Sequence, residues 1–133
     1  MDEFRHSLRV RWGECDPQGV VFNANYLAYF DIAITELWRD LGGYAQMVAG
    51  GADMVVAEAR IRYLAPLRFD DEFDVVLRGV KLGNTSITSE LAVERAGETL
   101  IEGELRHVFI DPNGDGTAPI PQPVRAGLAR YQI

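Results

Sequence analysis

The sequence predicts an α+β domain in which one long helix is wrapped by an antiparallel sheet of about five strands. Apolar residues recur at spacings of three and four across residues 24–41 and cover almost the whole circumference of that helix. After residue 51 the apolar period becomes two, and the segments between the runs are too short for parallel crossovers. On an open sheet, a helix with so little polar surface would leave one apolar side in water. The sheet must therefore curl around it, or a second subunit must cover it.

A strand and a tight turn precede the helix. Residues 8–12 alternate between apolar side chains and arginines, which indicates a strand with one face in water. The tetrapeptide Asp16-Pro17-Gln18-Gly19 has the residue preferences of a type I turn. Asn23 is the expected N-cap of the helix, and the Gly42-Gly43 pair is its expected end.

The remaining strands are expected in the second half of the chain, at residues 55–63, 73–82, 87–93 and 100–110. In the first of these, one face should carry Val55, Ala57, Ala59, Ile61 and Tyr63. The separators "APLRFDD", "GNTS" and "RAG" are short and turn-like, so neighbouring strands should be antiparallel. The tail from residue 117 reads as an extended segment followed by a short final turn of helix, and residues 1–133 should form one domain.

Composition narrows the class of protein. The 133 residues are 47% hydrophobic and 25% charged, as in a soluble globular domain, and no apolar run reaches the ~18 residues that span a bilayer. The net charge of −7 argues against a nucleic-acid partner, because binding phosphate requires cations. The N-terminus lacks the features of a signal peptide, and the single cysteine, Cys15, fits a reducing compartment. We expect a cytoplasmic protein that does not insert into membranes.

Asp16 is the best candidate for a catalytic group, although its pattern has two interpretations. An aspartate before proline, with glycine at the fourth position, is ordinary turn chemistry. The same turn leads into the N-terminus of a buried helix, where unpaired backbone N–H groups and the positive end of the helix dipole gather. A carboxylate beside such donors has the parts that acyl transfer needs, a nucleophile or base and a site for the developing oxyanion. Spacing alone leaves the two interpretations evenly balanced.

Other candidate groups are weaker. The segment Asp111–Gly116 matches the first half of a calcium loop, but Gln122 stands where a bidentate glutamate is needed, so a solvated turn is favoured. His107 alternates in phase with apolar residues and is more typical of a packed sheet position than of a base. Cys15 has no basic neighbour in the sequence that would form a thiolate. No metal site and no cofactor are predicted.

The segment "RWGECDPQGVVFNANYLAYFD" closely resembles the signature of the 4-hydroxybenzoyl-CoA thioesterase-like family of hotdog-fold proteins, especially in its Asp-Pro-x-Gly-x-Val form. The similarity continues through "VVAEARIRYLAPLRFDDEFDV", "LGNTSIT" and "DPNGDGTAPIPQPVRAGL", so it covers nearly the whole chain. The resemblance implies a long central helix wrapped by an antiparallel sheet. It also implies homodimers whose sheets join, often paired into tetramers, with active sites between protomers.

By this resemblance the protein is an acyl-CoA thioesterase that hydrolyses a small to medium acyl-CoA without a cofactor. Asp16 would attack the thioester carbonyl or activate a water, and the backbone N–H of Asn23 would polarise the thioester oxygen. The acyl pocket would involve Val21, Phe22, Asn25 and Tyr26, while Lys81 and Ser86 would contact the CoA. Phe22 and Tyr26 are equally consistent with the core.

Two departures from the family pattern limit the substrate assignment. Asn23 replaces the aromatic side chain that the 4-hydroxybenzoyl-specific enzymes present at this position. The basic run that those enzymes use near the CoA nucleotide is reduced here to "KLGNTS", with Lys81 as its only cation. The tail residues Arg125 and Arg130 are further candidates for the CoA, although a solvated surface is the favoured role of each. The alternatives are a thioesterase acting on acyl carrier protein and a non-catalytic acyl-CoA-binding protein with the same fold.

Overall fold

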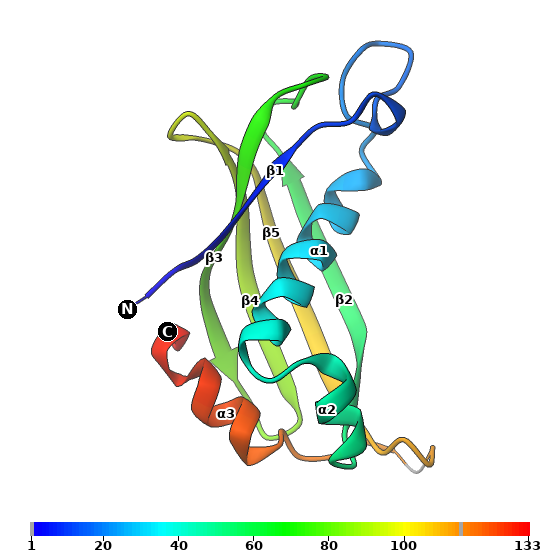
Figure 1. Ribbon diagram of the computed structural model, residues 1–133, viewed down its shortest axis with the longest axis vertical. Coiled ribbons are helices and arrows are strands. Elements are labelled where there is room, and N and C mark those ends of the chain that lie inside the picture. Colours follow the sequence, from blue (N-terminus) through cyan, green and yellow to red (C-terminus); the bar gives the residue numbers. More distant parts are fainter. Residues whose placement is uncertain (1, 115) are drawn as a thin grey trace.

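The computed structural model describes residues 2–114 and 116–133. Five strands form one sheet in the order β1-β3-β4-β5-β2, with every neighbouring pair antiparallel, and the sheet curls around helix α1 (Figure 1). The strands are β1 (Phe4–Arg9), β2 (Asp53–Tyr63), β3 (Glu72–Leu82), β4 (Ser86–Arg95) and β5 (Glu98–Ile110). The α-helices are α1 (Asn25–Asp40), α2 (Tyr44–Ala49) and α3 (Gln122–Leu128). The predicted α+β architecture is confirmed.

Helix α1 carries the core against the concave face of the sheet. Its buried residues are Tyr26, Tyr29, Phe30, Ala33, Ile34, Leu37 and Trp38. They pack against apolar side chains of the three central strands β3, β4 and β5. A large apolar side chain contributes about 1.5–3 kcal/mol when it is removed from water, so burial of this helix against the sheet is a major source of stability.

The ends of α1 differ slightly from the prediction of residues 24–41. The N-cap position belongs to Ala24, and no side chain caps the helix, so the predicted role of Asn23 as N-cap is wrong. Asn23 lies instead inside a turn, because the Asn25 N–H donates to the Phe22 carbonyl at 2.9 Å. The predicted stop is confirmed: Gly42 and Gly43 follow the helix with φ of +105° and +91°, a conformation that costs glycine little.

The first strand lies earlier in the chain than predicted. Strand β1 ends at Arg9, and Trp12 belongs to a 3₁₀ turn spanning Trp12–Glu14, where its side chain is 73% exposed. The alternation of residues 8–12 therefore marked a strand end rather than a strand. The four remaining strands were predicted within one to two residues of their bounds, whereas α2 was not predicted.

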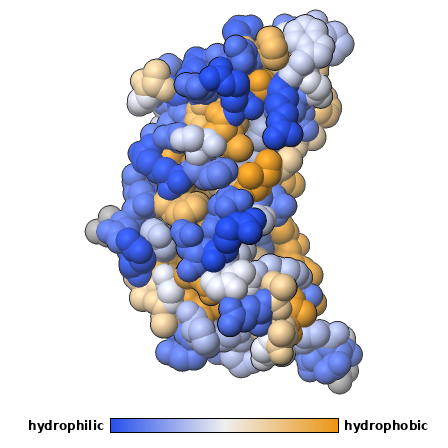
Figure 2. Space-filling model, viewed as in Figure 1, coloured by the Kyte–Doolittle hydropathy of each residue, from blue (hydrophilic) through white to orange (hydrophobic). Residues whose placement is uncertain are grey.

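Strand β2 departs most from the expected pattern of one buried face. It forms an edge of the sheet and contains a bulge between Val56 and Glu58, which breaks the alternation. Val55 and Val56 are both about half exposed, although they point to opposite faces of a regular strand. Figure 2 shows apolar side chains reaching the surface on the side of the molecule where α1 and β2 lie.

The tail follows the prediction of an extended segment and a short final helix. Helix α3 and a 3₁₀ turn at Ala129–Tyr131 place Val124, Leu128 and Tyr131 against the core. No helix within the described residues has both the length and the apolar character needed to cross a membrane.

Candidate functional site

Asp16 lies at the tip of a small hairpin between β1 and α1. The hairpin closes through a bridge between Cys15 and Val21 and through the Asp16 N–H, which donates to the Val20 carbonyl at 2.8 Å. Asp16 also shapes the turn itself: its carbonyl accepts from the Gly19 N–H at 2.9 Å, and its Oδ1 accepts from the Gln18 N–H at 2.8 Å. Gly19 has a φ of +80°, which explains a glycine at the fourth position.

The side chain of Asp16 therefore acts as a turn former, as one of its two interpretations requires. Only Oδ1 is used by the turn, and no hydrogen bond to Oδ2 is recorded within the described residues. An ionised carboxylate has two acceptor oxygens, so Oδ1 can accept the hydrogen bond of the turn while Oδ2 is available to a ligand. Turn formation and catalysis are compatible at this residue.

The hairpin meets the entrance of α1 at the Phe22–Asn23 peptide. The Phe22 carbonyl accepts from the Asn25 N–H, which fixes the plane of this peptide and hence the direction of the Asn23 N–H. That N–H donates to no group in the part of the chain that the structure describes. It lies at the positive end of the helix dipole, where an acceptor with developing negative charge is stabilised.

A pocket of about 390 Å³ opens at this junction, and Asp16 and Asn23 both line it. Its lining joins the hairpin, the start of α1 and the segment after β2: Asp16, Val20, Val21, Phe22, Asn23, Tyr26, Tyr63, Leu64, Ala65 and Pro66. Five residues singled out from the sequence are thus brought together, namely Asp16, Val21, Phe22, Asn23 and Tyr26. Apart from Asp16, Asn23 and the two tyrosine hydroxyls, the lining is apolar.

Two tyrosines hold the pocket wall in place. The hydroxyl of Tyr26 accepts from the Leu67 N–H at 3.0 Å, and burial raises the pKa of this phenol, so it remains protonated. The hydroxyl of Tyr63 donates to the Asn23 carbonyl at 3.1 Å. The two rings meet edge to face with centroids 5.7 Å apart. Tyr26 thus serves the core and the pocket together.

Sequence reasoning missed the part of the lining that follows β2. Tyr63 was expected only as a strand residue, Pro66 was assigned to a connecting turn, and Leu64 between them was given no role. Tyr63 and Leu64 are each about half exposed. A pair of large apolar residues directly before a proline turn is unusual for a solvated loop, and this was the available signal.

Three predicted substrate residues lie outside the pocket. The side-chain amide of Asn25 donates to the Glu14 carbonyl at 2.8 Å, so it ties the hairpin to the helix and does not line the pocket. Lys81 and Ser86 lie at the β3–β4 turn, whereas the hairpin lies near the start of β3, roughly 33 Å away for ten residues of strand (Figure 1). Within one protomer, neither residue reaches the Asp16 pocket.

The cations proposed for the CoA are occupied by local partners. Lys81 Nζ lies 3.9 Å from a Glu90 carboxylate oxygen, and Arg125 donates to the Gly83 carbonyl at 2.6 Å. Arg130 pairs with Asp2 at 2.8 Å. Exposed pairs of this kind contribute little stability, so a phosphate could displace them at small cost.

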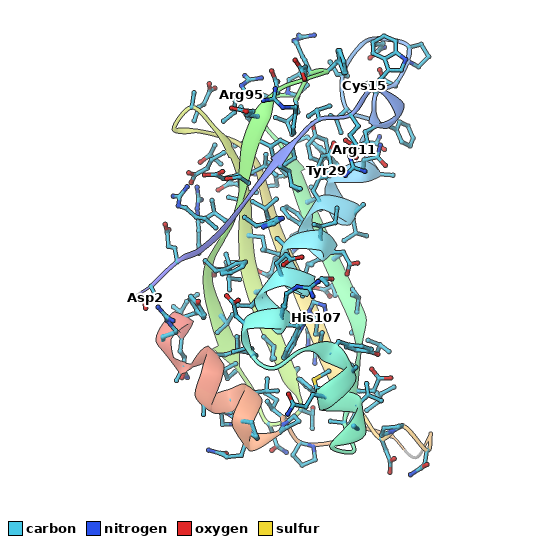
Figure 3. All side chains as sticks on the ribbon, in the orientation of Figure 1. Asp2, Arg11, Cys15, Tyr29, Arg95 and His107 are labelled. Atoms are coloured by element: carbon cyan, nitrogen blue, oxygen red, sulfur yellow. The ribbon has the colours of Figure 1, made fainter. Side chains whose placement is uncertain are left out.

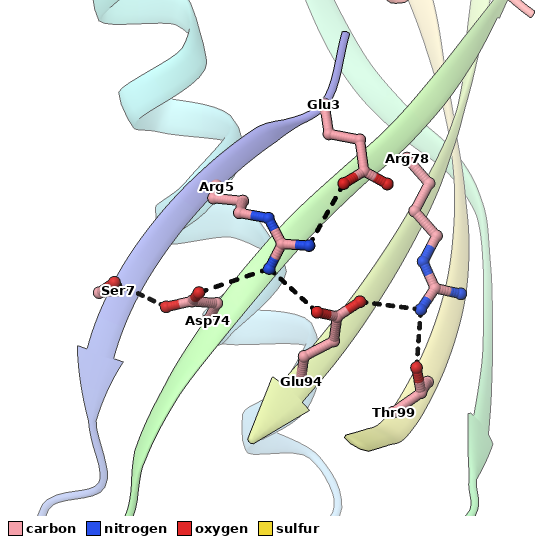
Figure 4. A network of polar contacts seen from close by, with 7 residues as sticks. All are labelled: Glu3, Arg5, Ser7, Asp74, Arg78, Glu94 and Thr99. Atoms are coloured by element: carbon pink, nitrogen blue, oxygen red, sulfur yellow. Dashed lines mark hydrogen bonds and ion pairs between the residues drawn. The ribbon is translucent and has the colours of Figure 1, made fainter. Parts of the chain in front are cut away.

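A larger hollow, of about 1160 Å³, is not lined by Asp16 and lies along β1, β3 and the β4–β5 turn. Three of its four arginines, Arg5, Arg9 and Arg95, are paired with carboxylates. Arg5 contacts Glu3, Asp74 and Glu94, and Glu94 also accepts from Arg78 (Figure 4). Most of the positive charge at this hollow is therefore neutralised by local carboxylates.

For Cys15, His107 and Asp111, the structure agrees with the non-catalytic interpretation that the sequence favoured. Burial and the nearby carboxylates of Asp16, Glu14 and Asp71 raise the pKa of Cys15, which favours the thiol over the thiolate. His107 is buried toward the other end of α1, well away from the hairpin (Figure 3). Asp111 forms a turn by accepting from the Asn113 N–H at 2.9 Å, while Asp115 of the same segment lies outside the described residues.

Comparisons of sequence and structure with known proteins identify thioesterases among the relatives of this chain. Residues 10–128 match the thioesterase-like superfamily. The acyl-CoA thioester hydrolase YbgC of Escherichia coli O6:H1 is 32% identical over 111 residues, which make up 82% of this chain and 83% of that protein. A crystal structure of a hypothetical protein from Aquifex aeolicus has a TM-score of 0.88 at 31% identity, over 94% of this chain and 98% of the other. A gentisyl-coenzyme A thioesterase structure has a TM-score of 0.83 at 25% identity, over 93% and 98%.

Proposed function

This chain belongs to the thioesterase-like superfamily and is a thioester hydrolase of the hotdog fold, and from that premise we propose that it hydrolyses acyl-CoA with Asp16 as the catalytic carboxylate. One observation carries the assignment of the site. Asp16 and Asn23 line the same pocket at the entrance of a buried helix, and the Asn23 N–H donates to no group within the described residues. A carboxylate and a free backbone donor in one pocket are the two parts that acyl transfer needs.

The proposed reaction uses water as the second substrate. The thioester carbonyl oxygen accepts from the Asn23 N–H, which stabilises the negative charge that develops on that oxygen. Asp16 then either removes a proton from a water that attacks the carbonyl carbon, or attacks this carbon itself and forms a mixed anhydride that water cleaves. In both routes the carbon–sulfur bond breaks, the acid gains the water oxygen, and the CoA sulfur leaves as a thiolate that takes up the remaining proton.

The pocket favours a small to medium acyl group. Its volume of about 390 Å³ is near the lower end of the range for ligand sites, and its walls are mostly apolar. Phe22 is about half exposed at the pocket, which suits a contact with a chain or ring. The related gentisyl-coenzyme A thioesterase makes aromatic acyl groups a sensible part of the substrate panel.

The active form is proposed to be a homodimer built on β2, which can pair again into a tetramer. Strand β2 is an edge of the sheet, and Val55, Val56 and Tyr63 leave large apolar surface at that edge. An exposed apolar edge strand with unpaired backbone groups is a template for joining a second sheet. Since Tyr63 and Leu64 also line the Asp16 pocket, such pairing would enclose the site between protomers, where the partner's Lys81 and Ser86 could reach the CoA.

The proposal is tested by measuring thiol release from a panel of short, medium and aromatic acyl-CoA thioesters with wild type and Asp16→Asn. Wild type should turn over at least one class of thioester. The variant should lose about 10²-fold or more in kcat, because amide replaces the nucleophile or base, while its fold is retained. Thiol release by Asp16→Asn at the wild-type rate would refute the assignment.

The same acyl group on CoA and on acyl carrier protein distinguishes the two thioesterase alternatives. Faster turnover on acyl carrier protein would indicate that the enzyme binds the carrier protein rather than the CoA nucleotide. Tight acyl-CoA binding without hydrolysis across the panel would indicate the non-catalytic alternative.

A further inference from the structure

Glu14 is bonded to both sides of the junction between the Asp16 hairpin and helix α1. It is the last residue of the 3₁₀ turn, directly before the hairpin that begins at Cys15. Its backbone carbonyl accepts from the Phe22 N–H at 3.0 Å and from the Asn25 side-chain amide at 2.8 Å. The first bond closes the hairpin, and the second connects it to the first turn of α1.

The side chain of Glu14 adds a second connection, one turn further along the helix. Its Oε1 accepts from the Arg11 N–H and from the Tyr29 hydroxyl, both at 2.8 Å. Asn25 and Tyr29 are four residues apart, so they lie on one face of α1, and Glu14 contacts that face at two points. Figure 3 shows Arg11, Cys15 and Tyr29 gathered at the same end of the molecule.

Tyr29 is a rigid partner for this contact. Its side chain is 2% exposed, and its ring packs against Phe73 with centroids 4.8 Å apart and against Tyr26 at 5.9 Å. Burial and the hydrogen bond to Glu14 raise the pKa of Tyr29 far above its usual value. The hydroxyl therefore remains a donor at every working pH, and it holds the carboxylate in one place.

We propose that Glu14 and Tyr29 are positioning residues, which fix the Asp16 hairpin against α1 so that the carboxylate faces the Asn23 N–H. The proposal rests on the proposed function, because it assigns the geometry of that same site. Neither residue lines the pocket, and each acts through the hairpin or the helix. A displacement of about 1 Å between reacting groups can reduce the rate by about 10²-fold, so loss of this anchor should appear in kcat.

A purely structural role makes a different prediction. The pair Tyr44 and Asp53 is also a tyrosine hydroxyl bonded to a carboxylate, but it joins α2 to β2 and lies outside the Asp16 pocket. Tyr44→Phe is therefore a control that removes the same kind of bond without touching the hairpin, at a tyrosine that is about half exposed. If hydrogen-bond loss acted only through stability, the two tyrosine variants would behave alike in kinetics.

The experiment measures kcat, KM and thermal midpoint for wild type, Tyr29→Phe, Glu14→Ala, Glu14→Gln, the Glu14→Ala/Tyr29→Phe double variant and Tyr44→Phe. Tyr29→Phe should reduce kcat by about tenfold or more and change KM by less than about threefold, because acyl-CoA binding does not use this contact. Glu14→Ala should lose at least as much. Glu14→Gln retains an oxygen acceptor for Tyr29 and should recover most of the rate. Tyr44→Phe should retain the wild-type kcat.

The double variant tests whether the two residues act through one contact. Its loss in kcat should be close to that of Glu14→Ala alone, since the second substitution removes a partner that is already unpaired. Additive losses would overturn the proposal, as would a Tyr29→Phe kcat within about twofold of wild type, or an equal loss in Tyr44→Phe. Assays below every measured thermal midpoint exclude unfolding, and the isosteric Tyr29→Phe is decisive if Glu14→Ala does not fold.

Asp16→Asn, assayed in parallel, separates the two levels of inference. Activity that is lost in Asp16→Asn but unaffected in Tyr29→Phe and Glu14→Ala would overturn only the positioning role. Activity retained in Asp16→Asn would overturn the assignment of Asp16 and the positioning role that depends on it.

Discussion

Replacing Gly103 with alanine adds a single methyl group and should disturb the packing of α1 against the sheet. This glycine lies in the middle of β5, paired with Ile61 of β2 and Leu91 of β4. A Cβ at this position would lie 2.4 Å from Cε2 and 2.7 Å from Cζ of Phe30. Phe30 is fully buried in α1, so its ring cannot move into solvent. Gly103→Ala must therefore displace the helix, the ring or the strand.

Two opposing terms set the expected size of the effect. Overpacking a dense core costs about 1–3 kcal/mol, while replacing glycine with alanine at a compatible φ stabilises by about 0.4–1 kcal/mol through the unfolded chain. Taken at the middle of each range, the net loss in the free energy of unfolding is about 1.3 kcal/mol. With an unfolding entropy of about 2.1 cal/mol/K per residue, 133 residues convert this loss to a decrease of roughly 5 °C in the thermal midpoint.

Calorimetry or denaturant titration at fixed protein concentration measures this loss, with Gly13→Ala as the matched control. A Cβ at Gly13 would meet no atom within 4 Å, so this variant should unfold at or slightly above the wild-type midpoint. Combining Gly103→Ala with Phe30→Leu should cost less than the sum of the single variants, because leucine lacks the atoms that clash. An unchanged midpoint in Gly103→Ala, or strict additivity in the double variant, would refute the packing argument.

Two further predictions concern titration and assembly. Burial lowers the pKa of His107 below its usual 6.5, against the opposing effect of the Asp31 carboxylate, so the unfolded chain binds a proton more readily than the folded one. The stability that neutral His107 contributes is therefore complete above about pH 6.5 and is lost as the pH falls through the lower pKa of the folded state. Between about pH 7.5 and 5, the thermal midpoint of His107→Leu should therefore fall less than that of wild type. Val56→Lys should place a charge on the exposed edge of β2 and shift sedimentation toward the monomer. If wild type itself sediments as a monomer at micromolar concentration, pairing through this edge is contradicted.

The overall architecture could be predicted because two strong periodicities occupy most of the chain. The apolar pattern of α1 and the alternation of β3, β4 and β5 result from burial against one common core, so pattern and structure have the same cause. The prediction of secondary structure was wrong at segments whose conformation does not depend on burial in the core. Trp12 alternates correctly but lies in an exposed 3₁₀ turn, and β2 contains a bulge that sequence does not reveal.

The candidate site was predicted only in the part that is contiguous in sequence. Asp16 and Asn23 occur within one short motif, so recognising the motif located both. Tyr63 and Leu64 reach the pocket from the end of β2, and this proximity depends on tertiary packing around Tyr26. The family resemblance assigned Asn25 to the pocket, yet its side chain turns back to the Glu14 carbonyl. Side-chain direction at a helix start follows from such local acceptors, which sequence spacing does not encode.

The exposed side of α1 and the edge strand β2 lead to the same conclusion about assembly. The sequence required that a helix with so little polar surface be covered either by a curled sheet or by a second subunit. The sheet covers most of it, but Leu27 and Ile32 remain 38% and 40% exposed, and Val55 and Val56 of the edge strand are about half exposed. Apolar surface of this kind along a sheet edge is the usual place for a second sheet to pair. The curled sheet therefore supplies one of the two coverings, and the pairing along β2 proposed above would supply the other.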